Sequence, residues 1–209
     1  MADDPVSVQV RRLVDEALEN FDSPDVTTTA LVRKAQRIAV LRRDYAKQIA
    51  FIMQTDDVFS DVKSDLGKPN PLVLQARAQL ATLLGADEEI RETDRQFQSF
   101  MRSRRIKGEK FSGVSVSQLE DNLRALERAY DDAEPQPNLT PIDAAFAADR
   151  AAETRASLLP DLQWTRGTLG KIRQDVHNYL VSVETDLLAG KVNSDIFQRA
   201  QLYINEALK

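Results

Sequence analysis

The chain has 209 residues, of which 42% are hydrophobic, 29% are charged and 6% are aromatic, and its formal net charge is −5 at pH 7. It contains no cysteine and one histidine, which excludes disulfides, thiolate metal sites and cysteine nucleophiles and leaves almost no ligands for zinc. The net negative charge argues against a surface built wholly for nucleic acid, and no apolar run reaches the roughly 18 residues that a membrane span needs.

Apolar residues recur at helical spacing along the first half of the chain. Asp4-Pro5 and Asn70-Pro71 each place a capping residue before a proline, which is typical of a helix start, and glycines follow two of the segments. The long second segment has three threonines as alternative caps. We expect helices over residues 5–21, 28–54, 57–66, 71–84 and 88–106.

The second half of the chain carries the same kinds of signal for the starts and ends of helices. Ser117 and Glu120 have the spacing of a capping box, and Thr140-Pro141 repeats the cap-then-proline start. An alanine-rich helix then carries Ile142 and Phe146 on its apolar stripe, and we expect Pro160 to stop or kink it. The expected helices cover residues 118–132, 141–158 and about 166–189, with a last one from 193.

Each segment has one apolar stripe, which a soluble helix must bury against a neighbour. We therefore expect an all-α fold: a compact bundle of about eight or nine amphipathic helices, mostly antiparallel neighbours, with essentially no sheet. The basic and then glycine- and serine-containing stretch RSRRIKGEKFSGVSVS is the best internal boundary. It predicts subdomains at 1–106 and 118–209 with a linker or exposed loop at 107–117, unless the two form one continuous domain.

Arg173 and His177 are the pair that comes nearest to a catalytic arrangement. Helical spacing places them one turn apart on one flank, beside the apolar stripe. The pair is similar to the arginine and histidine of HEPN-type helical ribonucleases, although the interval between the two is shorter here. Acid–base catalysis would need the imidazole in a cleft and the arginine aimed at a phosphate. The structural alternative, which we favour, is a boundary histidine with an i,i+4 neighbour.

Two groups of basic residues are candidates for a binding surface. One is a polar face of the helix expected over 28–54, and the other precedes the expected linker: Arg33, Arg37, Arg43 and Lys47, and then Arg102, Arg104, Arg105, Lys107 and Lys110. Such charges can bind phosphates, an acidic protein surface or anionic lipid, although no aromatic residues are interleaved for stacking on bases. A solvated helix face is the ordinary alternative.

Trp164 is the only tryptophan and lies near an expected helix boundary in DLQWTRG. Burial is the default expectation for it, and an anchor for a partner's pocket is the alternative. The sequence has no metal-ligand spacing, no phosphate-binding glycine loop and no GxSxG motif. We therefore expect no metal and no cofactor.

The N-terminal part of the chain carries a family resemblance. A short leading helix, VRRLVDEAL, is followed by TTTALVRKAQRIAVLRRDYAKQIAFIM, in which the pattern consists of Leu31, Arg33, Lys34, Ala35, Ala39 and Leu41. This arrangement resembles the AbiTii-type domain of bacterial abortive-infection proteins. The resemblance implies a role in antiphage defence and transfers no catalytic residues.

The lack of a complete catalytic set favours a non-enzymatic, cytoplasmic interaction or regulatory subunit of a bacterial system. We expect it to dock a protein partner, or a second copy, through an exposed apolar or basic helix face. Self-association would use leftover stripe residues, namely Phe59, Phe97, Phe100 and Tyr203. Two alternatives stay open: a metal-independent ribonuclease using Arg173 and His177, and a nucleic-acid-binding accessory protein using a basic helix face.

Overall fold

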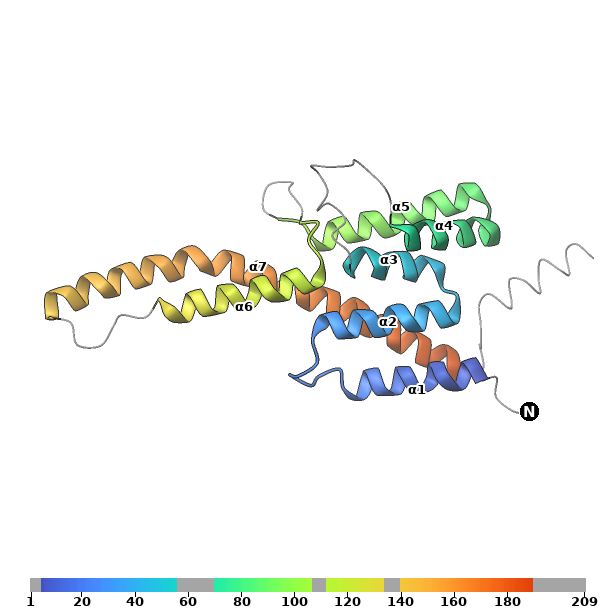
Figure 1. The fold of residues 1–209 in the computed structure, drawn as a ribbon, viewed down its shortest axis with the longest axis horizontal. Coiled ribbons are helices and arrows are strands. Elements are labelled where there is room, and N and C mark those ends of the chain that lie inside the picture. The colour runs from blue at the N-terminus through green and yellow to red at the C-terminus, as the bar shows by residue number, and fades with distance from the viewer. Residues whose placement is uncertain (1–4, 56–69, 107–111, 134–139, 190–209) are drawn as a thin grey trace, which may run out of the picture.

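Seven α-helices make up the part of the chain that the structure, a computed structural model, describes: residues 5–55, 70–106, 112–133 and 140–189 (Figure 1). These residues contain no strand, so the predicted all-α class is confirmed. The helices expected over 57–66 and from 193 onwards fall outside the described residues. The helices are α1 (Pro5–Glu19), α2 (Thr28–Arg42), α3 (Tyr45–Thr55), α4 (Pro71–Leu84), α5 (Ala86–Ser103), α6 (Val116–Asp132) and α7 (Pro141–Leu188).

The single helix expected over 28–54 is two helices, which corrects that prediction. Arg43 lies in the left-handed region with φ 56° and ψ 33°, and the Asp44 N–H turns back to the Ala39 carbonyl at 2.9 Å. These contacts satisfy the last carbonyls of α2 in the manner of a Schellman ending. The Asp44 carboxylate then accepts the Lys47 N–H at 3.2 Å and so starts α3. The break is hidden in the sequence because the apolar period continues across it.

The helix boundary expected at Pro160 is also wrong, because α7 runs for 48 residues through that proline. A proline removes one backbone donor from a helix, and packing elsewhere along the helix can offset that loss. Pro160 is exposed, and the buried residues of α7 begin two positions later at Leu162. The C-terminal half of α7 is therefore held by its buried face, and the N-terminal half continues the same helix outward.

Two hydrophobic cores hold the helices together. The larger core joins α1, α2, α6 and the C-terminal half of α7 with Phe51 of α3, and the smaller one joins α3, α4 and α5. The helices on either side of the stretch 107–117 thus share the larger core. The most completely buried members of the larger core include Leu31, Ile38, Leu119, Ile172 and Leu180, and the smaller core consists of Ile49, Met53, Ala76, Leu80 and Phe100.

The start of α6 is tied to the start of α2. The N-cap of α6 is Ser115, whose hydroxyl accepts the Gln118 N–H at 3.3 Å, so the capping box expected at Ser117 is not formed. Glu120 instead reaches the first turn of α2, where its carboxylate accepts two backbone N–H groups and the Thr29 hydroxyl. A carboxylate there satisfies free donors and complements the helix dipole. The contact joins residues from the two halves of the chain.

Candidate functional site

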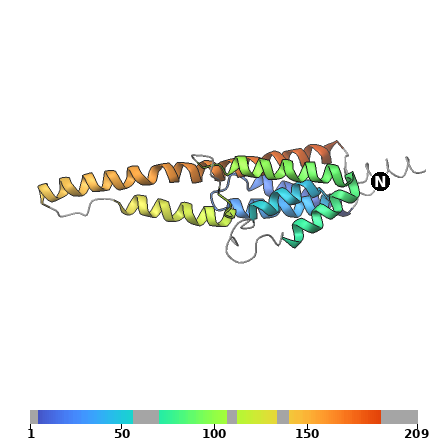
Figure 2. The same ribbon diagram turned by 90° about the horizontal axis from the view of Figure 1, so that it is seen from above.

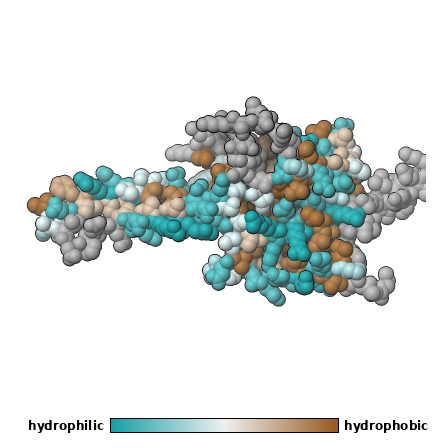
Figure 3. Space-filling view, viewed as in Figure 1, coloured by the Kyte–Doolittle hydropathy of each residue, from teal (hydrophilic) through white to brown (hydrophobic). Residues whose placement is uncertain are grey.

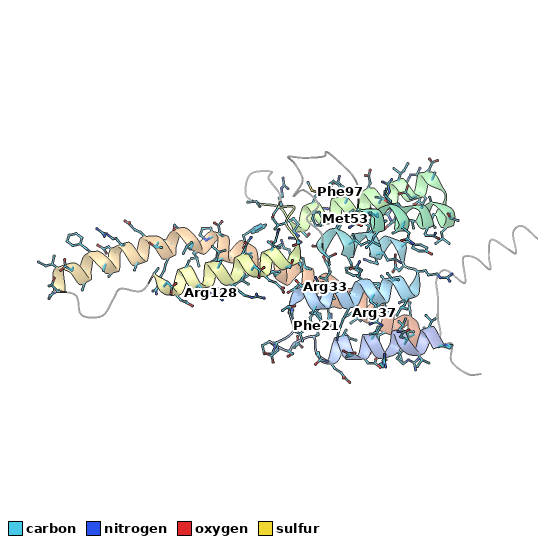
Figure 4. The ribbon with its side chains drawn as sticks, in the orientation of Figure 1. Phe21, Arg33, Arg37, Met53, Phe97 and Arg128 are labelled. Carbon is cyan, nitrogen blue, oxygen red and sulfur yellow. The ribbon has the colours of Figure 1, made fainter. Side chains whose placement is uncertain are left out.

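Arg173 and His177 lie on α7 against the loop that joins α1 to α2. The Arg173 guanidinium donates to the Val26 carbonyl at 2.9 Å and to the Phe21 carbonyl, and its central carbon is 5.2 Å from the centroid of the Phe21 ring. The same ring meets His177 edge-on at 5.0 Å. Phe21, labelled in Figure 4, therefore contacts both side chains. The guanidinium binds backbone carbonyls, and this geometry supports a structural role for the pair.

We expect Arg173→Met to lower the free energy of unfolding by about 1.5 kcal/mol, because two loop carbonyls lose a charged donor. Urea denaturation of the full chain measures the loss. Lys171→Met, at an exposed position on the same helix, is the matched control and should change stability by less than about 0.5 kcal/mol. A ribonuclease centre would give the opposite result: unchanged stability together with RNA cleavage that is lost in Arg173→Met and His177→Ala.

The basic residues expected on one face of residues 28–54 are separated by the break at Arg43. Arg33 and Arg37 remain one turn apart on the exposed side of α2, as Figure 4 shows. Arg43 lines a cavity of about 320 Å³ beside α4, whereas Lys47 lines a groove between α3, α5 and α7. The four side chains therefore do not form one continuous stripe.

The second basic cluster is dispersed as well. Arg104 is fully buried, and burial lowers the pKa of its guanidinium to about 10. It is therefore not part of an exposed binding face, which corrects the sequence-based expectation. Arg102 and Arg105 are exposed, and Lys107 and Lys110 lie outside the described residues.

The side chains expected to support self-association are also placed differently from the prediction. Phe100 is only 3% exposed and belongs to the smaller core, and Phe97 packs against that core. Figure 4 labels Phe97 on α5 beside Met53 on α3. Phe59 and Tyr203 lie outside the described residues.

The first half of α7 projects from the helical body together with α6, as Figures 1 and 2 show. We call α6 and residues 141–161 of α7 the arm. Arg155 joins its two helices, because its Nε donates to the Tyr130 carbonyl at 3.2 Å and its guanidinium lies over the Tyr130 ring. Closer to the body, Arg166 and Glu127 form an ion pair at 2.7 Å. The N-terminal end of α7 extends past the end of α6 (Figure 1).

None of the residues from 141 to 161 is buried. Ile142 is 71% exposed and Phe146 is 63% exposed, and the two lie one turn apart near the free end of the arm. Apolar colour marks this end of the molecule in Figure 3. The periodic pattern assigns both residues to an apolar stripe, but no helix in the part of the chain that the structure describes buries them. The sequence pattern alone therefore missed this candidate binding surface.

The charged residues around the arm tip are mostly acidic. Asp143, Asp149 and Glu153 are exposed there, and Arg150 is the cation among them. The tip therefore combines an exposed aromatic side chain with surrounding carboxylates. This composition is typical of a protein-binding site that has an aromatic anchor residue and a polar rim.

Trp164 lies at the base of the arm and is half-buried. Its Nε1 donates to the Arg105 carbonyl at 2.8 Å, so one edge of the indole is held by the fold. The side chain also lines a cavity of about 600 Å³ together with Leu126 and Pro160. Trp164 thus combines a fixed orientation with contact to an open, mostly apolar space.

The structure and the comparisons add three findings on the wider class of the protein. None of the described helices combines the length and the apolar content that crossing a bilayer requires. Within the described residues, no three side chains from histidine, cysteine, aspartate and glutamate converge as ligands for a metal ion. Comparison with known proteins found no match to a family model, to a curated protein or to a solved structure.

Proposed function

We propose that this protein is a non-enzymatic docking subunit that binds a partner protein through the tip of the arm. The observation that carries the proposal is the run of residues 141–161 without a buried member, in which Ile142 and Phe146 are the large apolar side chains nearest the tip. The resemblance to AbiTii-type domains suggests cytoplasmic antiphage defence in bacteria as the setting of this docking.

The physical argument rests on how a helix is stabilised in water. Most of the stability of a helix in a protein comes from packing an apolar face against a neighbour. The N-terminal end of α7 extends past the end of α6 (Figure 1), and none of residues 141–152 is buried. A partner that covers Phe146 and Ile142 would bury the apolar surface that the body of the protein leaves exposed.

The surface chemistry of the tip also describes the partner. An apolar groove on the partner would complement the exposed aromatic ring. Basic residues at the rim of that groove would complement the surrounding carboxylates of Asp143, Asp149 and Glu153. We therefore propose a partner with an apolar groove edged by lysine or arginine.

Co-purification from the native host followed by quantitative mass spectrometry tests this function. The double variant Ile142→Ser/Phe146→Ser should retain at least about tenfold less of the partner than the wild type, because it removes the anchor. Both side chains are exposed, so circular dichroism should show unchanged helix content.

Ala148→Ser/Ala152→Ser is the matched control, because both alanines are exposed on another side of the same helix. It should retain the partner at the wild-type level. Identical sets of retained proteins from all three chains would contradict the proposal, and so would a wild-type monomer that retains nothing. A dimer that dissociates in the double variant would identify the partner as a second copy.

A further inference from the structure

A polar groove lies between α3, α5 and the C-terminal half of α7, away from the arm. Its volume of about 350 Å³ falls in the range of small-molecule sites. Phe51 of α3, Phe100 of α5 and Val176 of α7 form apolar parts of its wall. Polar side chains of these helices and of the end of α2 line the rest.

The charges along this groove sum to −1 when all are ionised, because three carboxylates face two cations. Arg42 is already paired, with its Nη2 2.7 Å from Asp186. The positive charge of Lys47 acts on both Asp44 and Asp175, and that of Arg42 acts on Asp44 as well. The five charged side chains are Arg42, Asp44, Lys47, Asp175 and Asp186.

The environment of the two aspartates favours an added positive charge. Burial raises the pKa of Asp44, and partial burial raises the pKa of Asp175, which keeps contact with solvent at the rim of the groove. In both cases the ionised carboxylate lacks part of the hydration it would have in water. A cation bound in the groove would stabilise both ionised forms.

Tyr179 gives a second and independent indication of a ligand. Its side chain is 5% exposed, lines the groove and meets the Phe51 ring edge-on at 5.2 Å. Its buried hydroxyl has no hydrogen-bond partner among the described residues. Burial raises the pKa of this phenol, the negative charges of Asp44 and Asp186 raise it further, and the positive charge of Arg42 opposes them. All three charged side chains also line the groove. Buried hydroxyls in proteins are nearly always paired.

The chemistry of the groove separates three classes of ligand. An anion would compete with Asp186 for Arg42 and would be repelled by Asp44. A metal ion would need converging ligands, and the described carboxylates do not converge in that way. A protonated amine has three donors, which can reach a carboxylate and the Tyr179 oxygen while its carbon skeleton packs on Phe51.

We propose that the groove binds a small organic ammonium ion, a primary amine with one positive charge and an apolar portion. Asp44 is its counter-charge, Asp175 adds negative charge at the rim, and the Tyr179 hydroxyl accepts one of its N–H groups. This site is independent of the arm, so the result of its test does not depend on the docking function.

Titrations of the ¹⁵N-labelled full chain followed by NMR test the ligand class. The probes are butylamine, 2-phenylethylamine and tryptamine, each matched with the alcohol of the same skeleton: butanol, 2-phenylethanol and tryptophol. We expect saturable shifts of the amides around Lys47, Phe51 and Tyr179 with at least one amine, and binding of its alcohol that is weaker by at least about tenfold. Equal binding of amine and alcohol, or no saturable shift with any amine up to about 10 mM, would overturn the proposal.

Two conservative variants test the site itself. Asp44→Asn keeps a capping side chain at the start of α3, and Tyr179→Phe keeps the ring, so both variants should fold. Each should weaken binding of the amine probe, by about tenfold for Asp44→Asn and severalfold for Tyr179→Phe, and the second should not lower the melting temperature. Asp15→Asn, at an exposed carboxylate on α1, is the control and should bind like the wild type. Wild-type affinity in both groove variants would refute the assignment.

Discussion

Asp186→Leu is expected to lower the free energy of unfolding by about 2 to 3 kcal/mol. Arg42, the last residue of α2, has only 9% of its side chain exposed, and its Nη2 lies 2.7 Å from Asp186 on α7. Loss of the carboxylate leaves a buried cation without its direct partner, which costs more than the loss of a surface ion pair. Asp44 remains near the guanidinium and limits the cost. Urea denaturation of the full chain measures the change.

The reverse substitution is the control for this prediction. Arg42→Met leaves behind Asp186, 32% of whose side chain is exposed, so water can solvate the carboxylate. We expect a loss of about 1 kcal/mol from Arg42→Met, and we expect the double variant Arg42→Met/Asp186→Leu to be more stable than Asp186→Leu alone. Equal losses from the two single substitutions would show that the burial of Arg42 does not set the energetics of this pair.

Glu120→Ala should lower the free energy of unfolding by about 2 kcal/mol, more than the loss of an average helix cap. The carboxylate of Glu120, on α6, accepts the backbone N–H groups of Thr28 and Thr29 and also the Thr29 hydroxyl. The substitution therefore removes a cap from α2 and a tie between α2 and α6 at the same time. Hydrogen exchange should show the first turn of α2 opening faster, and urea denaturation gives the total loss.

Two further variants distinguish the contact between Glu120 and α2 from the loss of a surface carboxylate and from the loss of a local helix cap. Asp121→Ala removes a neighbouring, exposed carboxylate that pairs with Arg124 on the surface, and it should cost less than about 0.5 kcal/mol. Thr27→Ala removes the local side-chain cap of α2, which binds the Ala30 N–H at 3.1 Å, and should cost about 1 kcal/mol. A Glu120→Ala variant no less stable than Asp121→Ala would mean that the contact between α6 and α2 contributes little.

Local signals predicted several helix starts correctly. Asn70 caps α4 by accepting the Leu72 N–H at 2.7 Å, and Thr140 caps α7 by accepting the Asp143 N–H at 3.3 Å. Both starts were expected from a capping residue followed by proline. They are predictable because a capping side chain and the backbone N–H that donates to it lie within three residues of each other, so the interaction is formed by the local sequence.

The candidate sites were much less accessible to sequence analysis. Helical spacing placed Arg173 beside His177, but Phe21, which contacts both, comes from about 150 residues earlier in the chain. The groove likewise depends on Asp44 and Tyr179, which lie far apart in the chain and share no helical spacing that would predict their proximity. Contacts of this range depend on which helices become neighbours, and an apolar period does not specify that.

The sequence by itself determined that the chain folds into helices, because the period of the apolar residues and the short-range caps act within a few residues. The tertiary structure alone decided that the residues 28–54 turn at Arg43 and that α7 continues through Pro160. It also decided that Arg104 is buried while Phe146 is exposed. The physical reason is that burial depends on whether a second helix covers the same face, and that partner is supplied by a distant part of the chain.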